Sequence, residues 1–168
     1  ASAHAAGALS YVAIMNDGFC IELASPADLD GICAVIGDSV RTVYPLYYTG
    51  EFVDFFLSLH EKSAVLSDIM SRIVYCVRLD GLVVGTVTVC GNTVKRLFVS
   101  PRYMRRGIGS ALMDRAEEMI FSEHDCAICD ASAPAVSVYA GRGYVRVRTE
   151  CITCGGSVLS YEVMEKKK

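Results

Sequence analysis

The sequence predicts a single α+β, or mixed α/β, domain in which one pair of strands runs parallel. The chain has 168 residues, of which 52% are hydrophobic and 21% charged, a composition typical of one globular domain. Strand-like and helix-like patterns alternate along it. A helical segment separates the strand-like segments 93–99 and 126–131. Because a parallel pair needs such a crossover, these two strands are expected to be parallel.

The first half of the chain predicts one strand followed by helices. Residues 19–24 form a short strand, and the sequence SPAD at 25–28 is typical of a helix start, with a capping serine, an early proline and an acid in the first turn. This helix continues to about Val43, where the aromatic segment 44–48 interrupts it. Further helical segments are expected over about 50–60 and 63–71.

The second half predicts six strands and two helices. The β-prone runs 73–79 and 82–90 flank Asp80-Gly81, which is a hairpin signal, and a second turn leads into strand 93–99. A helix is expected from Gly109 to about Ser122, with an apolar stripe that includes Ile108, Leu112 and Ala116. The remaining elements are strand 126–131, a short helix over 134–140, and strands 144–153 and 157–164.

A glycine turn opens the long helix of the second half, within LFVSPRYMRRGIGSAL at residues 97–112. Gly107 and Gly109 have no Cβ, so their backbone N–H groups can approach a ligand closely. The helix start adds free N–H groups and the positive end of its dipole, and Arg105 and Arg106 add charge. The segment lacks the Lys-Ser/Thr ending of a Walker loop and the full G-x-G-x-x-G pattern. We predict a pyrophosphate site, with a plain structural turn as the alternative.

Two segments together resemble the GNAT superfamily of N-acetyltransferases. The run 94–112 looks like its acyl-CoA-binding core, Gln/Arg-x-x-Gly-x-Gly/Ala. Met104 stands in the Gln/Arg position, which weakens one side-chain contact without removing the site, since the family uses this loop mainly through backbone amides. The run ASAPAVSVYAGRGYVRV at 131–147 is similar to the family's short helix with a tyrosine, followed by a Gly-aromatic pair, here Gly143-Tyr144. The order of elements agrees from about residue 19 to 164.

The resemblance implies a fold, an activity and a cofactor site. The fold is a mostly antiparallel seven-stranded sheet, with strands four and five parallel and splayed apart, flanked by helices. The activity is transfer of an acetyl group from acetyl-CoA, the cosubstrate, to a primary amine by direct attack. Backbone groups of the fourth strand would pair with the pantetheine arm, and the glycine turn would hold the pyrophosphate. The implied cofactor-binding residues are Leu97, Phe98, Val99, Met104, Arg105, Arg106, Gly107, Ile108, Gly109 and Ser110.

The resemblance also implies an acid but leaves the base unassigned. Tyr139 matches the family's tyrosine, which can protonate the departing thiolate; a packed core aromatic is the alternative. An N–H near Phe98 or Val99 can stabilise the oxyanion. Some members carry a glutamate near the start of the fourth strand, but no acid stands near Thr93. Other candidates, each more typical of a surface charge, are Glu22, Glu51, Asp54, His60 and Glu150.

The acceptor is expected to be a small-molecule amine whose identity the sequence leaves open. Aromatic residues gather just after the first helix and are interpreted either as walls of an acceptor pocket or as core packing with a contact to a second copy in a homodimer. They are Tyr44, Tyr47, Tyr48, Phe52, Phe55 and Phe56. Because no acid stands near Thr93, a non-catalytic acyl-CoA-binding sensor or regulatory module is the alternative function.

Cysteine spacing raises the question of zinc. Cys126-x-x-Cys129 and Cys151-x-x-Cys154 have nearly the spacing of a zinc ribbon. However, residues three apart in a strand face opposite sides, and 126–131 is predicted to be a strand. We therefore expect no metal, and a redox role for Cys151 and Cys154 stays open.

Charge and hydropathy exclude other classes of partner. The net charge of −3 gives no basic field for nucleic acid, and no apolar run reaches the length of a membrane span. Residues 1–17 are expected to be an N-terminal extension, left by processing or added artificially, ahead of an N-acetyltransferase domain over 18–165. Since no Lys or Arg precedes the apolar opening, a secretory signal fits poorly and a cytoplasmic location is expected.

Overall fold

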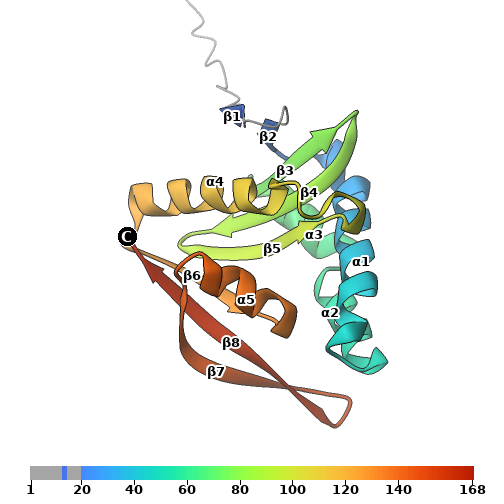
Figure 1. The fold of residues 1–168 in the computed structure, drawn as a ribbon. Coiled ribbons are helices and arrows are strands. Elements are labelled where there is room, and N and C mark those ends of the chain that lie inside the picture. Colours follow the sequence, from blue (N-terminus) through green and yellow to red (C-terminus); the bar gives the residue numbers. More distant parts are fainter. Residues whose placement is uncertain (1–12, 15–19) are drawn as a thin grey trace, which may run out of the picture.

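The computed structural model describes residues 13–14 and 20–168. Within these residues the strands form one mixed sheet in the order β1-β2-β3-β4-β5-β6-β8-β7, and only β5 and β6 are parallel neighbours (Figure 1). The strands are β1 (Ala13–Ile14), β2 (Cys20–Leu23), β3 (Val74–Leu79), β4 (Leu82–Cys90), β5 (Thr93–Val99), β6 (Cys126–Ala131), β7 (Val145–Cys154) and β8 (Ser157–Lys167). The helices are α1 (Leu29–Val43), α2 (Gly50–Leu59), α3 (Lys62–Met70), α4 (Ile108–Glu123) and α5 (Ala133–Gly141).

The predicted fold class is confirmed, with β2 to β8 as the seven predicted strands. β1 is an additional strand that the sequence did not indicate; it pairs antiparallel with β2 through Ala13 opposite Ile21 and Ile14 opposite Cys20. It falls within segment 1–17, whose separation from a domain over 18–165 stays a prediction. Among the described residues no helix has the length and apolarity of a membrane span.

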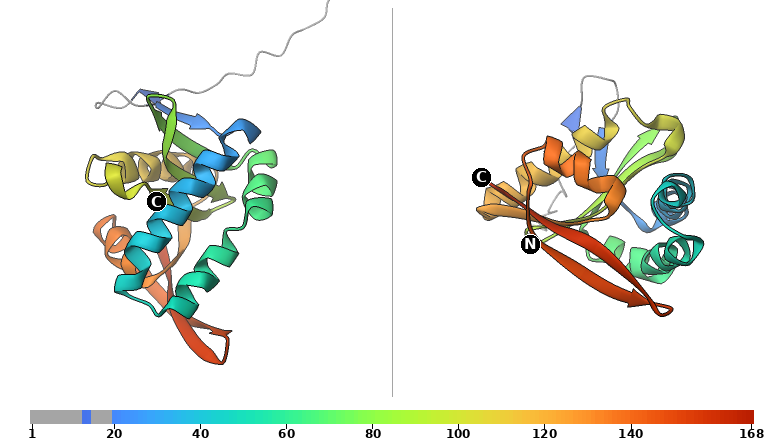
Figure 2. Two further views of the ribbon diagram at one scale, coloured as in Figure 1. Left: turned by 90° about the vertical axis from the view of Figure 1, so that its right-hand side faces the viewer. Right: turned by 60° about the horizontal axis from the view of Figure 1, so that its bottom comes forward.

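Helices cover both faces of the sheet. The helices α1, α2 and α3 pack on one face, around buried side chains such as Ile32, Ile36 and Val65. The helices α4 and α5 lie on the other face, where Leu112 and Ile120 are fully buried (Figure 2). The amphipathic spacing of these helices therefore reflects two separate cores that share the central strands.

The parallel pair separates soon after it forms. β5 and β6 pair only through Thr93 opposite Ile128 and Val94 opposite Cys129, and then diverge (Figure 1). Just past this point β5 bulges: Thr88 is opposite Lys95 but Thr86 is opposite Phe98, so β5 carries one extra residue. Arg96, in the bulge, has a φ of +47°. A bulge bends its strand and increases its twist, which turns the end of β5 away from β6.

The turn of the C-terminal hairpin, between β7 and β8, contacts α2. Gly155 and Gly156 both have positive φ, the conformation of a tight hairpin turn, and they join β7 to β8 as the sequence predicted. At this end of the hairpin the Ser157 hydroxyl donates to Glu51 of α2 over 3.4 Å. The turn of the hairpin thus lies next to α2 (Figure 1).

The two cysteine pairs lie on strands that are not neighbours in the sheet. Cys126 and Cys129 belong to β6, Cys151 and Cys154 belong to β7, and β8 lies between these strands. Cys129 is fully buried, and burial raises its pKa to about 12. The described residues include no group of three or more possible metal ligands. The expectations about metal and redox roles stay predictions.

Candidate active site

One cavity, of about 340 Å³, lies between the end of β5, the start of α4 and α5. Its lining includes nine of the ten residues that the sequence assigns to the cofactor: Leu97, Phe98, Val99, Met104, Arg105, Gly107, Ile108, Gly109 and Ser110. Arg106 is not part of the lining, and its guanidinium carbon lies 5.2 Å from the centre of the Tyr103 ring. We name this space the cofactor cavity.

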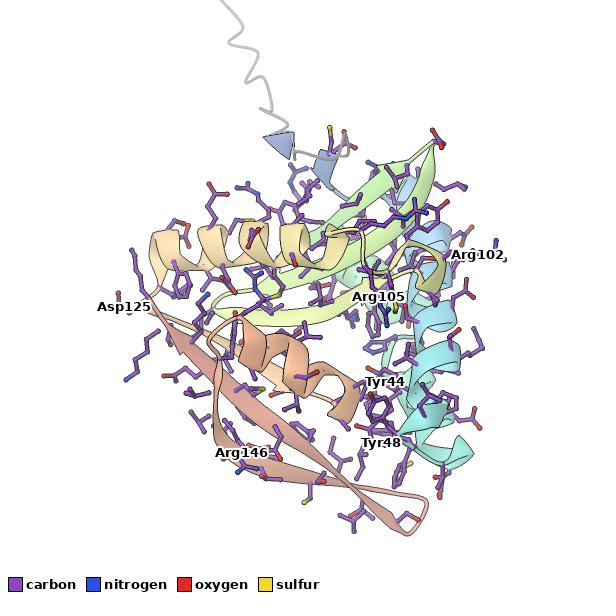
Figure 3. All side chains as sticks on the ribbon, viewed as in Figure 1. Tyr44, Tyr48, Arg102, Arg105, Asp125 and Arg146 are labelled. Atoms are coloured by element: carbon purple, nitrogen blue, oxygen red, sulfur yellow. The ribbon has the colours of Figure 1, made fainter. Side chains whose placement is uncertain are left out.

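Backbone donors of the glycine turn border the cofactor cavity. Gly107 is the residue before α4 and has a φ of +82°, which a β-branched side chain rarely adopts. The first N–H bonded within the helix is that of Ala111, which donates to the Gly107 carbonyl over 2.9 Å. The N–H groups of the first turn ahead of Ala111 therefore have no partner within the helix. Arg105 lies on the same loop (Figure 3). These donors and this charge fit a pyrophosphate.

A second cavity, of about 390 Å³, lies on the other side of the gap, with walls from α2, β5, β6 and the β7–β8 hairpin. Aromatic side chains make much of its lining: Tyr44, Phe55, Phe56, Phe98, Tyr139 and Tyr161. Ile152 and Leu159 of the hairpin add apolar surface. We name this space the acceptor cavity.

The two cavities meet at a shared wall. The residues that line both are Tyr44, Leu97, Phe98, Ser132, Ala135 and Tyr139. Only 5% of Tyr139 is exposed, and burial raises the pKa of its phenol, so the hydroxyl keeps its proton at physiological pH. Two ligands that enter from opposite cavities would therefore meet beside a protonated phenol.

A family model described as an acetyltransferase (GNAT) domain matches residues 47–165, most of the chain. The chain belongs to this family. It is therefore an acetyl-CoA-dependent GNAT N-acetyltransferase, and of the two functions considered from the sequence, the enzyme is the one that family membership supports. An Escherichia coli (strain K12) protein named uncharacterized N-acetyltransferase YafP is 25% identical over 132 residues, which cover 79% of this chain and 85% of that protein.

Solved structures share the GNAT fold. A GCN5-related N-acetyltransferase from Rhodopseudomonas palustris superimposes with a TM-score of 0.82 at 22% identity and covers 88% of this chain and 94% of its own. The PaiA N-acetyltransferase from Thermoplasma acidophilum, solved in complex with coenzyme A, has a TM-score of 0.72 at 20% identity and covers 90% and 99%. This likeness confirms the predicted architecture of the sheet and helices.

Some of the aromatic residues between Tyr44 and Phe56 of this GNAT enzyme line a cavity, and others pack in the core, as the two interpretations of the sequence proposed. Tyr44, Phe55 and Phe56 line the acceptor cavity, whereas Tyr48 packs behind them with its ring centre 5.0 Å from that of Phe56. The Tyr48 hydroxyl accepts a hydrogen bond from the N–H of Ala133 over 2.6 Å. The Tyr44 hydroxyl lies 3.1 Å from that of Ser132. Both tyrosines thereby hold the start of α5, and with it Tyr139, against α1 and α2 (Figure 3). A homodimer stays a prediction.

Four of the five candidate bases lie outside both cavities. Glu22 pairs with Arg78, Glu51 lies at the hairpin turn, and Asp54 belongs to α2 without lining either space. Glu150 is bound by Arg148 and by the Tyr161 hydroxyl. The family's glutamate position, near Thr93, has no acid. None of these four acids is therefore placed to act as the base, which stays unassigned.

His60 is the one candidate that lines the acceptor cavity. The Arg96 Nε–H donates to its Nδ1 over 3.3 Å, and Arg96 also pairs with Asp68. Burial, with a further contribution from the Arg96 charge, lowers the pKa of His60 to about 4. Because Nδ1 accepts from Arg96, the ring proton is on Nε2. His60 is thus a neutral hydrogen-bond donor at physiological pH, and a poor base.

His60 gives the fold a measurable pH dependence. Its pKa is about 4 in the folded chain against an ordinary 6.5, so the unfolded chain binds the proton more readily. Its contribution to stability is complete above about pH 6.5 and is lost as the pH falls toward 4. In urea unfolding, we expect His60→Gln to show a shallower loss of unfolding free energy over this window than the wild type. The exposed His124, changed to Gln, is the matched control, and equal slopes for all three proteins would contradict the assignment.

Asp130 is a site residue that the sequence analysis missed. Of the residues that the structure describes, it is the only acid that lines the acceptor cavity. The segment Cys126–Ala131 was treated as an apolar central strand, and Asp130 is its single charged residue. A charge near the carboxyl end of an otherwise apolar strand was the signal available in the sequence.

Proposed function

We propose that this GNAT enzyme transfers the acetyl group of acetyl-CoA to the primary amine of a small molecule held in the acceptor cavity. The observation that supports this is the meeting of the two cavities at Tyr139. The cofactor cavity presents backbone donors at the start of a helix, and the acceptor cavity presents an apolar pocket of ligand size.

The cofactor cavity binds acetyl-CoA through main-chain groups in this proposal. The N–H groups of Ile108, Gly109 and Ser110 and the charge of Arg105 hold the pyrophosphate. The backbone of Leu97 to Val99 pairs with the pantetheine arm, because β5 has no strand partner on its β6 side beyond Val94. The Val99 carbonyl already accepts the Ser39 hydroxyl over 2.7 Å and keeps one lone pair for a ligand. Acetyl-CoA supplies the thioester that the amine attacks.

Tyr139 acts as the general acid. The neutral amine nitrogen attacks the thioester carbonyl, the C–N bond forms and the C–S bond breaks. An N–H of Phe98 or Val99 stabilises the negative charge on the carbonyl oxygen, and the Tyr139 phenol donates its proton to the sulfur. The proton released by the amine passes to water in the acceptor cavity, from which Tyr139 is reprotonated. The net products are the N-acetyl compound and free coenzyme A.

A coenzyme A release assay across classes of amine tests this function. We expect release above the rate of acetyl-CoA hydrolysis with at least one small primary amine, together with formation of its N-acetyl product by mass spectrometry. Binding of coenzyme A by calorimetry provides a parallel measurement. Binding of coenzyme A without turnover of any small amine would contradict the proposal, as would turnover restricted to protein N-termini or lysines.

A further inference from the structure

We infer that the acceptor is a hydrophobic primary amine without a neighbouring carboxylate, and that Asp130 binds its ammonium group. This inference rests on the proposed function and specifies the substrate class of the same site. It follows from where Asp130 lies, from the absence of a partner for its carboxylate, and from the chemistry of the surrounding walls.

Asp130 faces the acceptor cavity because of its place in β6. Side chains alternate along a strand, and Ala127, Cys129 and Ala131 are all fully buried on the face that α4 and α5 cover. Asp130, between the last two, points to the opposite face and lines the acceptor cavity together with Tyr139. Its charge is near enough to add to the rise that burial causes in the pKa of Tyr139. The Asp130 carboxylate and the Tyr139 phenol thus border the same space.

The Asp130 carboxylate has no hydrogen bond or ion pair among the described residues, although other acids near this cavity do. Asp68 pairs with Arg96, and Glu150 is bound by Arg148 and by Tyr161. Asp130 is exposed to the solvent of the cavity, and an unpaired carboxylate beside aromatic side chains is free to bind a cation. An acceptor ammonium supplies that cation.

The same carboxylate selects against α-amino acids. In an α-amino acid the carboxylate is attached to the carbon that bears the amine. An amine placed at Asp130 would bring this second negative charge beside the first, and like charges at that distance repel. Within the described part of the chain two cations line the cavity, both on β5. Arg96 is already engaged by Asp68 and His60, and Lys95 is exposed to solvent. A monocationic amine avoids this repulsion.

The walls favour an apolar body on that amine. Besides its aromatic residues the cavity is lined by Leu59, Val94, Ile152 and Leu159. A space of about 390 Å³ holds a small ring with a short side chain. The rings of Tyr139 and its aromatic neighbours also attract an ammonium through their faces. An arylalkylamine or a branched alkylamine satisfies both the carboxylate and the walls.

Because Asp130 binds the charged form of the amine, its effect is expected in KM. The pair with Asp130 stabilises the ammonium, whereas the attack requires the neutral amine, which loses its proton to water. Asp130→Asn should therefore raise the KM for a cationic acceptor about 10-fold with a smaller change in kcat, as the loss of a charge-assisted hydrogen bond implies. The KM for acetyl-CoA should stay unchanged, because Asp130 does not line the cofactor cavity.

The test compares 2-phenylethylamine with phenylalanine, which adds only the carboxylate, and with phenylacetic hydrazide, whose nucleophilic nitrogen is neutral at neutral pH. We expect kcat/KM for 2-phenylethylamine to exceed that for phenylalanine by about 100-fold. Asp130→Asn should raise KM for 2-phenylethylamine and leave KM for the hydrazide within about twofold, and Asp130→Glu should restore part of the loss. Asp125→Asn, an exposed change just before the same strand and at its far end, is the matched control (Figure 3).

Three results would overturn the inference while leaving the proposed function intact: phenylalanine or a peptide N-terminus as the better acceptor, an equal rise in KM for the hydrazide, or no effect of Asp130→Asn. Calorimetric binding of 2-phenylethylamine to the enzyme loaded with coenzyme A gives a second reading that does not depend on turnover. If no amine is acetylated but this binding is lost in Asp130→Asn, the proposed function fails and the ammonium site stands.

Discussion

Tyr139→Phe is expected to lower kcat by about 100-fold while the KM for acetyl-CoA and the free energy of unfolding stay close to those of the wild type. The change removes only the hydroxyl, so the ring keeps its contact with Tyr144, whose ring centre is 5.4 Å away. The phenol lines both cavities and is protonated at neutral pH, and burial raises its pKa still further above that range. Without it the thiolate leaves unprotonated, which raises the barrier of the chemical step and leaves binding unaffected.

Tyr144→Phe is the matched control for this change. Tyr144 is a second buried tyrosine against the same helix, but it lines neither the cofactor nor the acceptor cavity. Its variant should keep kcat within about twofold, because Tyr144 borders neither of the spaces in which the two substrates would lie. Rates are measured by coenzyme A release under saturating acetyl-CoA. Equal losses in the two variants would mean that the effect is structural, and full activity of Tyr139→Phe would remove Tyr139 from the mechanism.

Gly107→Val should weaken coenzyme A binding about 100-fold. At a φ of +82° a β-branched side chain is strained, and relieving the strain turns the N–H groups of the first α4 turn away from the cavity. Those groups are the proposed pyrophosphate ligands, so their displacement removes several charge-assisted hydrogen bonds together. Isothermal titration with coenzyme A measures the change in Kd.

Gly81→Val separates this loss from general strain. Gly81 has almost the same φ, +79°, in the β3–β4 hairpin turn, with open space where a Cβ would stand. Both variants should therefore lose a similar free energy of unfolding, on the order of 1–3 kcal/mol, but only Gly107→Val should lose affinity. Unchanged coenzyme A binding in Gly107→Val would exclude the glycine turn as the pyrophosphate site.

The sequence predicted the elements well because their signals are local. Each of three signals depends on neighbours within a few residues: the hairpin turn at Asp80-Gly81, the helix-start pattern at residues 25–28 ahead of α1, and the apolar spacing of α4. β1 gave no such signal, since a strand of two residues is too short to show alternation. The glycine turn was found in the same way, from residues contiguous in the chain.

The site was less predictable where it depends on packing between distant segments. Arg96, in the bulge of β5, has a positive φ. Glycine is the residue type that indicates a positive φ in a sequence, so an arginine gave no sign of it. The neutral state of His60 arises from burial and from Arg96, 36 positions along the chain. Asp130 was hidden within an apolar strand, because strand periodicity indicates alternation and not which face borders a cavity.

The two halves of the site draw on different parts of the chain. The cofactor cavity has its own walls in the β5–α4 loop and the start of α4, whereas α2 and the β7–β8 hairpin border only the acceptor cavity. Under the proposed function, changes at the hairpin residues Ile152 and Leu159 are expected to alter which amine is accepted and to leave the binding of acetyl-CoA unchanged. Because the two cavities have different walls, substitutions in the hairpin can change the acceptor specificity one residue at a time. The hairpin is therefore the segment to randomise in a search for variants that acetylate another amine.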